Sequence, residues 1–276
     1  MRLFRVTAVL LLSAGGADAG DSAGRTWAWA ESALRAELTA ERPDLNKVAS
    51  LSFPLATRYP RSSALDKAAV FLRRQDPERL ACGDLADYLL IAGFLAGSGR
   101  KLDSRAAAAR FAGCRRATSL FDLAGGLLFD CRFGGSGKAD PRDVARLAAG
   151  QRPDGSFAEA DGRSNFYLTS HATLALFHCQ GPPVAVRRGQ AHLEWGLPHL
   201  RRAGMLDELA EALVFLRWMG VAAAQWDGHA AHVLSRARPD GGLCLLDAPG
   251  CPAHWHATSL LLELGGLMTD QGKGKE

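Results

Sequence analysis

The sequence has no long hydrophobic run. Its longest N-terminal apolar stretch extends only from Val6 to Leu12, whereas a transmembrane helix needs roughly 20 apolar residues. No later segment approaches that length. We therefore expect no membrane-spanning segment in the chain.

The sequence also lacks an excess of charge of one sign. Its 33 Lys and Arg residues are interspersed with 29 Asp and Glu residues, for a formal net charge of +4. A nucleic-acid-binding face needs basic residues that cluster along one surface. Nucleic acid is therefore not an expected partner.

The first 19 residues have the pattern of a secretory signal peptide. Arg2 and Arg5 precede the apolar stretch, and Ala17-Asp18-Ala19 supplies the small residues of a cleavage site. We predict a signal peptide over residues 1–19, one domain over residues 20–268 and a polar tail over residues 269–276. The protein is then expected to be secreted or periplasmic.

Six cysteines in an exported chain favour disulfide bonds, because oxidising compartments stabilise them. Cys244 and Cys251 flank one loop, and Cys131 and Cys179 lie near helix ends, which leaves Cys82 and Cys114. We predict these three pairs. Six cysteines allow many other pairings, and buried free thiols are the alternative.

Helical periodicity extends along the chain, and no segment has a convincing strand pattern. Apolar residues recur at helical spacing between charged ones. Helices are predicted over residues 27–38, 45–57, 62–74, 77–95, 103–117, 119–129, 166–179, 184–202, 205–218, 221–237 and 254–267, with one more beginning at 140–141. The fold class is therefore all-α, in about six antiparallel hairpins. The apolar helices 166–179, 205–218 and 254–267 are expected inside, and helices 184–202 and 221–237 outside.

Two segments resemble each other. QRPDGSFAEADGRSNFYLTSHATLALFHC begins at Gln151, and RARPDGGLCLLDAPGCPAHWHATSLLLEL begins at Arg236. In Pro-Asp-Gly, Pro presets one backbone angle, Asp bonds its own backbone and Gly permits positive φ. We predict structural turns at Asp154-Gly155 and at Asp240-Gly241, each leading into an inner helix that carries His-Ala-Thr.

The first of these turns resembles a known repeat. Residues 151–157, QRPDGSF, resemble the Gln-x-x-Asp-Gly-Ser-Trp/Phe motif of squalene and hopene cyclases, protein prenyltransferase β subunits and complement-type thioester domains, and residues 238–242 resemble a degenerate copy. The resemblance covers residues 150–265 and implies a single-domain α/α toroid, with two rings of helices around a central cavity. It implies no reaction, because members of this superfamily do unrelated things.

The reaction motifs of those families are missing. The sequence contains no Asp-x-Asp-Asp acid of the cyclases and no Cys-Gly-Glu-Gln of the thioester domains. It also lacks the Asp-x-Cys zinc ligands that prenyltransferases place on an earlier inner helix. Terpene cyclisation, thioester chemistry and the prenyltransferase zinc site are therefore not expected.

A different site is conceivable where the inner helices begin. If these helices start at one rim, His171 and His256 project from equivalent positions, with Asp207, Glu208 and Glu211 on the helix between them. Two imidazoles and a carboxylate could bind zinc and leave one coordination position for water. Such a water could attack an ester, amide or glycosidic bond.

His254 and Tyr167 adjoin the same rim and could add a ligand and a proton donor. In the alternative interpretation, His171 and His256 only cap their helices by bonding loop carbonyls, and His254 and Tyr167 only pack in loops with their polar tips in water. These two interpretations lead to two functions. The protein either binds a small molecule, glycan or peptide in a central cavity, or it is a metal-assisted hydrolase or another small-molecule enzyme that uses His171, Glu208 or Glu211, and His256.

Overall fold

The computed structural model describes residues 17–114, 119–133, 138–158, 162, 164–222 and 226–272, with the side chains of residues 17–22 and 269–272 left out. These residues form twelve α-helices, a 3-10 turn, a π-helical turn and one pair of two-residue strands. The all-α prediction is confirmed. The helices are α1 (Ala17–Leu38), α2 (Leu45–Arg58), α3 (Ser63–Arg73), α4 (Cys82–Gly97), α5 (Arg105–Cys114), α6 (Leu120–Leu128), α7 (Pro141–Ala149), α8 (Phe166–His178), α9 (Pro183–Ala203), α10 (Leu206–Trp218), α11 (Asp227–Ser235) and α12 (Trp255–Gly272).

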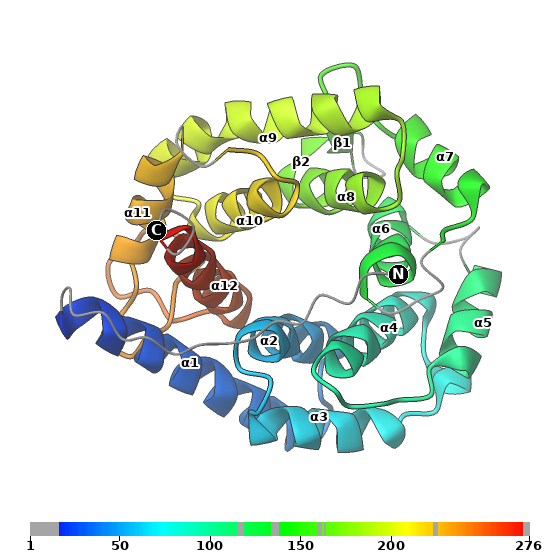
Figure 1. The fold of residues 1–276 in the computed structure, drawn as a ribbon, viewed down its shortest axis with the longest axis horizontal. Coiled ribbons are helices and arrows are strands. Elements are labelled where there is room, and N and C mark those ends of the chain that lie inside the picture. Colours follow the sequence, from blue (N-terminus) through cyan, green and yellow to red (C-terminus); the bar gives the residue numbers. More distant parts are fainter. Residues whose placement is uncertain are drawn as a thin grey trace.

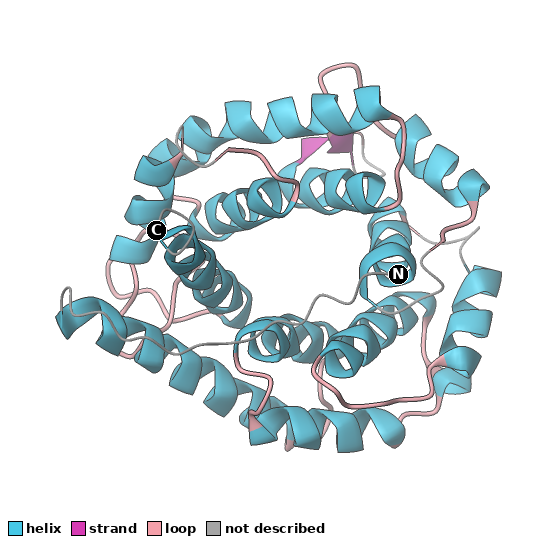
Figure 2. Ribbon diagram, in the orientation of Figure 1, coloured by secondary structure: helices cyan, strands magenta, loops and turns pink. Residues whose placement is uncertain are grey.

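The helices lie in two layers. Figures 1 and 2 show the even-numbered helices around the centre of the view and the odd-numbered helices outside them. Each even-numbered helix contacts the next one along the chain, and α12 contacts α2. We call these two sets the inner and the outer helices. The five helices that the sequence assigned to one or the other layer lie where it predicted.

Several elements of the structure differ from the prediction. Helix α1 begins at Ala17 and not at residue 27, and α12 continues to Gly272 and not to residue 267. The helix predicted over residues 77–95 is divided into the turn η1 (Pro77–Arg79) and α4, because Leu80 and Ala81 have extended backbones. The helix predicted over residues 221–237 begins only at Asp227. The strands β1 (Phe157–Ala158) and β2 (Ser164–Asn165), which the sequence did not predict, pair as a short antiparallel hairpin before α8.

The two ends of the chain are only partly described. Most of the predicted signal peptide, residues 1–16, lies outside the described residues, and Ala17–Ala19 form the start of α1. Within the predicted polar tail, residues 269–272 belong to α12 and residues 273–276 lie outside the described part. No helix in the described part is long and apolar enough to cross a membrane.

All three predicted disulfides are present. Cys82–Cys114 joins α4 to α5, and Cys131–Cys179 joins the π-helical turn η2 (Phe129–Phe133) to the end of α8. Cys244–Cys251 closes the loop that leads into α12. Three disulfides are typical of proteins that fold in an oxidising compartment.

The first and last inner helices are joined by a half-buried ion pair. Arg58 of α2 donates to both carboxylate oxygens of Glu263 in α12, at 3.1 Å and 2.9 Å, and Thr57 donates to the same carboxylate at 3.1 Å. Nearby, Phe53 packs against Phe94 and Trp218 with ring centroids 5.0 Å and 4.8 Å apart. Aromatic side chains of α2, α4 and α10 therefore pack against one another near this ion pair.

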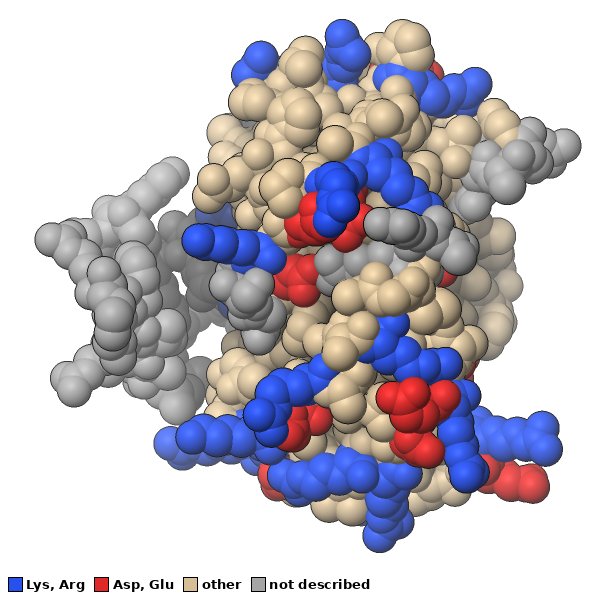
Figure 3. Space-filling model, turned by 90° about the vertical axis from the view of Figure 1, so that its right-hand side faces the viewer, with Lys and Arg blue, Asp and Glu red and all other residues tan. Residues whose placement is uncertain are grey.

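Charges of both signs mix on the outer surface. Figure 3 shows Lys and Arg side chains beside Asp and Glu side chains on the face that carries α5 and α7. Exposed pairs such as Arg105–Asp103 and Arg142–Asp140, at 2.6 Å and 2.9 Å, contribute to this mixture. Such exposed pairs are screened by solvent and contribute little to the stability of the fold.

Candidate functional site

The two Pro-Asp-Gly segments form the same turn. The amide of Arg152 donates to the carbonyl of Ser156, and the amide of Arg238 donates to the carbonyl of Gly242, both at 2.8 Å. Gly155 and Gly241 have φ angles of 87° and 90°. An added Cβ would lie within 2.6 Å of backbone atoms of Arg188 or Arg25. Glycine is needed here for both backbone conformation and space.

The aspartates hold these turns, and a threonine follows each one. Oδ1 of Asp154 and of Asp240 accepts a backbone amide two residues later, at 3.0 Å in both turns. The next amide, of Phe157 or Leu243, donates to the hydroxyl of Thr169 in α8 or Thr258 in α12, at 2.9 Å and 2.8 Å. Each turn is therefore anchored to its inner helix by a buried threonine.

These threonines correct the expected alignment of the two histidines. Because Thr169 corresponds to Thr258, the residue that corresponds to His256 is Tyr167, two positions before the threonine. His171 lies one helical turn further into α8 and corresponds to Leu260. The loop before α12 is three residues longer than the loop before α8, and this length shifts the repeated His-Ala-Thr. His171 and His256 therefore do not occupy equivalent positions.

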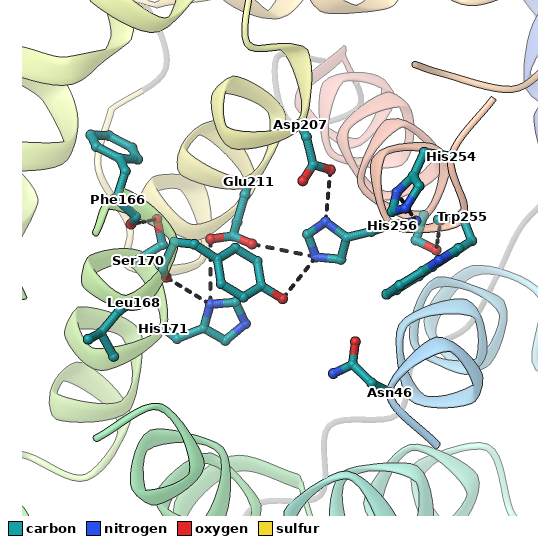
Figure 4. A network of polar contacts seen from close by, with 12 residues as sticks. Asn46, Phe166, Leu168, Ser170, His171, Asp207, Glu211, His254, Trp255 and His256 are labelled. Carbon is teal, nitrogen blue, oxygen red and sulfur yellow. Dashed lines mark hydrogen bonds and ion pairs between the residues drawn. The ribbon is translucent and has the colours of Figure 1, made fainter. Parts of the chain in front are cut away.

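The second residues of three inner helices meet at one rim. Tyr167, Asp207 and His256 hold this place in α8, α10 and α12. Nδ1 of His256 donates to Oδ1 of Asp207 at 2.8 Å, and Nε2 of His256 lies 3.3 Å from the Tyr167 hydroxyl. Figure 4 shows Asp207 and His256 directed toward each other. This pair can hold a proton on the imidazole and pass it to a bound molecule.

A second group of polar side chains, Glu211 and His171, lies one helical turn further along α10 and α8. Glu211 of α10 lies between two imidazoles: Oε1 is 3.5 Å from Nδ1 of His171, and Oε2 is 3.5 Å from Nε2 of His256 (Figure 4). Its side chain is 1% exposed, and neither oxygen has a hydrogen-bond partner among the described residues. Nδ1 of His171 also lies 3.1 Å from the carbonyl of Tyr167, in its own helix. The capping interpretation expected His171 to bond a loop carbonyl. Its bond lies instead within α8.

The carboxylates control the charge state of His256. Burial lowers the pKa of His256, but the hydrogen bond to Asp207 and the charges of Asp207, Glu211 and Glu208 outweigh this effect and raise the pKa above its ordinary value. Burial and the charges of Glu211 and Asp207 raise the pKa of Tyr167 well above its ordinary value. Mainly through burial, the pKa of Glu208 is also raised. Such shifts in one cleft are typical of functional sites.

A pocket of about 280 Å³ lies at the rim where Tyr167, Asp207 and His256 meet. Its lining residues are Tyr167, Asp207, Glu208, His254, Trp255 and His256. His254 takes part through its Nδ1 atom, which accepts the amide of His256 at 3.3 Å. The pocket therefore brings together Tyr167, Glu208, His254 and His256 from the predicted site, while Glu211 and His171 lie beneath it.

The sequence analysis missed the role of Asp207 and two residues across the rim. Asn46, the second residue of α2, donates to Asp87 of α4 at 3.3 Å. Burial and neighbouring aspartates raise the pKa of Asp87 to about 7, and its charge in turn affects Tyr167. The signal that would have found Asn46 and Asp207 is their place as the second residue of an inner helix.

The predicted zinc ligands do not form a metal site in the described part of the chain. No group of three or more His, Cys, Asp or Glu side chains there is arranged so that it could hold a metal ion. His254 bonds a backbone amide, and His256 uses Nδ1 for Asp207. These contacts fit proton transfer better than zinc coordination by His171, His254 and His256.

Comparison with known proteins adds no assignment. No protein-family model matches the sequence, and no curated protein matches it significantly. The likeness to the cyclase and prenyltransferase repeat therefore depends on the turn residues alone.

Proposed function

We propose that the chain is an exported α/α toroid that binds a small molecule, glycan or peptide in the pocket where α8, α10 and α12 begin. The two layers of helices and the repeated Pro-Asp-Gly turns support the toroid and its likeness to the cyclase and prenyltransferase repeat. The three disulfides support export.

One observation carries the binding proposal: the second residues of three helices converge on one pocket. At its wall, His256 is bonded to both Asp207 and Tyr167. Polar groups are costly to bury without full hydrogen bonding. A concave site with a few convergent polar groups and shifted pKa values is the usual place for a ligand.

The test is a ligand screen by thermal shift on the mature protein. Hits are repeated on Asp207→Asn and on Asp227→Asn, a control with the same chemical change at the exposed start of α11. A ligand of this pocket should stabilise the wild type and the control but not the Asp207 variant. Equal stabilisation of all three proteins would place the ligand elsewhere and contradict the proposal.

A second candidate is an acid–base enzyme. The hydrogen bond between Asp207 and His256 favours it, because a carboxylate that orients and charges an imidazole is the usual arrangement of a general acid or base. His256 would take a proton from a water that attacks an ester, amide or glycosidic bond and return it to the leaving group. A panel of chromogenic substrates with wild type and His256→Gln tests it, and activity that survives the substitution would exclude this role.

A further inference from the structure

We propose that the ligand of this pocket carries a positive charge in the form of an organic ammonium group. The inference rests on the proposed binding function and adds the class of ligand. Its basis is the excess of carboxylates at the rim over the cations that could balance them.

Carboxylates gather where α4, α6 and α10 begin. They are Asp84, Asp122, Asp207, Glu208 and Glu211, and Asp87, with its pKa raised to about 7, adds only part of a charge at neutral pH. No Lys or Arg is among the residues that line the pocket, and a positive charge on His256 would be balanced by its bond to Asp207, which leaves Glu208 and Glu211 in excess. Lys47 of α2 is already paired with Glu37 at 2.7 Å. The field inside the rim is therefore negative, and it attracts cations.

The helix dipole does not account for this arrangement. Acidic residues in the first turn of a helix are stabilised by the partial positive charge at its start, which could explain Asp207 and Glu208. Glu211 lies beyond that turn and is 1% exposed, without a hydrogen bond to either oxygen among the described residues. The groups nearest its two oxygens are the imidazoles of His171 and His256, each at 3.5 Å. A cation in the pocket would offset the charges that Asp207, Glu208 and Glu211 place there.

The aromatic wall of the pocket fits the same class of ligand, mainly through Trp255, because the Tyr167 ring stacks on Phe121 with centroids 5.2 Å apart. Tyr167 and Trp255 line the pocket together with Asp207 and Glu208. The face of an aromatic ring attracts an ammonium group, most strongly for Trp, and such contacts recognise quaternary ammonium ligands. Carboxylates and rings on one wall therefore favour a cation with an apolar surface over an anion or a neutral polar molecule.

The test uses three probes of nearly equal shape. Choline is positive, 3,3-dimethylbutan-1-ol is its neutral isostere, and 3,3-dimethylbutanoate is negative. Binding to the mature protein is measured by calorimetry and by tryptophan fluorescence. We expect choline to bind about tenfold or more tightly than the neutral probe, the anion to bind most weakly, and the preference to shrink as salt is raised.

Variants locate the effect. Glu208→Gln should reduce choline affinity several-fold and leave the affinity of the neutral probe unchanged, while Asp227→Asn should change neither. If the neutral probe binds as tightly as choline, the pocket binds ligands but the inference about charge is wrong. If none of the probes binds, the inference is also wrong, and the thermal-shift screen decides separately whether the pocket binds any ligand.

Discussion

The two Pro-Asp-Gly segments adopt one backbone geometry and deliver different chemistry. In both, an aspartate bonds an amide two residues later, a glycine has a φ near 90°, and a threonine of the next inner helix accepts the following amide. The first segment then presents Tyr167 to the rim, and the second presents His256. The turn is thus a structural device, and the chemistry depends on the second residue of the helix that follows.

The loops after the two turns explain why the repeated His-Ala-Thr does not place His171 and His256 at equivalent positions. The first loop forms the hairpin β1–β2, and the second is three residues longer and is closed by Cys244–Cys251. The second loop also reaches α10, where the carbonyl of Leu245 accepts the amides of Leu206 and Asp207. It therefore positions both partners of the Asp207–His256 bond.

The largest expected effect comes from replacing the turn glycines. Gly155→Ala and Gly241→Ala should each destabilise the protein by about 2 to 5 kcal/mol, because the positive φ and the clash with backbone both oppose a Cβ. Gly220→Ala is the control: its φ is 77° but nothing lies within 4 Å, so about 1 to 2 kcal/mol is expected. Denaturant unfolding measures all three. Tolerance of one turn substitution alone would show that the turns are not equivalent.

The second effect tests the loop that Cys244–Cys251 closes. Replacing Cys244 and Cys251 together with Ser should lower the free energy of unfolding by about 2 to 3 kcal/mol, the usual contribution of a short disulfide loop. Because the loop holds the start of α10, choline binding should weaken in parallel. Replacing Cys82 and Cys114 together is the comparison, since that pair lies on the outer side of α4 and should cost stability without selectively affecting the pocket. Equal effects on binding would contradict the role of the loop.

A smaller and equal effect is expected at the two threonines. Thr169→Val and Thr258→Val each leave a buried amide without its acceptor, which costs about 1 to 3 kcal/mol. Thr169→Ser and Thr258→Ser keep the hydroxyl and should recover most of this loss. Thermal unfolding of the four variants measures it. A Val variant as stable as its Ser counterpart would show that the hydroxyl does not anchor that turn.

The smallest effect on folding, and the sharpest on the site, is expected for Asp207→Asn. Removing this charge should lower the pKa of His256, because burial then opposes protonation with less compensation. In the wild type the raised pKa means that the pair stabilises the fold at low pH, and this advantage over the variant is lost as pH rises through the pKa of His256. Histidine titration by NMR measures the shift. An unchanged pKa would mean that Asp207 does not hold the proton on His256.

Much of the fold could be predicted because local signals are strong in this chain. Apolar periodicity located eleven of the helices, although α1, α4, α11 and α12 each begin or end five or more residues from the predicted boundary. Asp140-Pro141 predicted the start of α7, where Asp140 accepts the amide of Arg142 at 2.9 Å. Two disulfides were predicted from cysteines near a loop and near helix ends, and Cys82–Cys114 was the pair that remained among several possible pairings. Boundaries failed at Leu80–Ala81, where the backbone becomes extended without a clear stop signal, and at α11, which begins at Asp227.

The sequence by itself determined the helices, their inner or outer preference and the two turns, since all of these depend on neighbours along the chain. Only the tertiary structure decided that Tyr167, and not His171, corresponds to His256, because loop length sets which residue of a helix reaches the rim. It also brought Asp207 to His256 and Asn46 to Asp87. Such pairs join helices that are far apart in the sequence, so no local pattern records them.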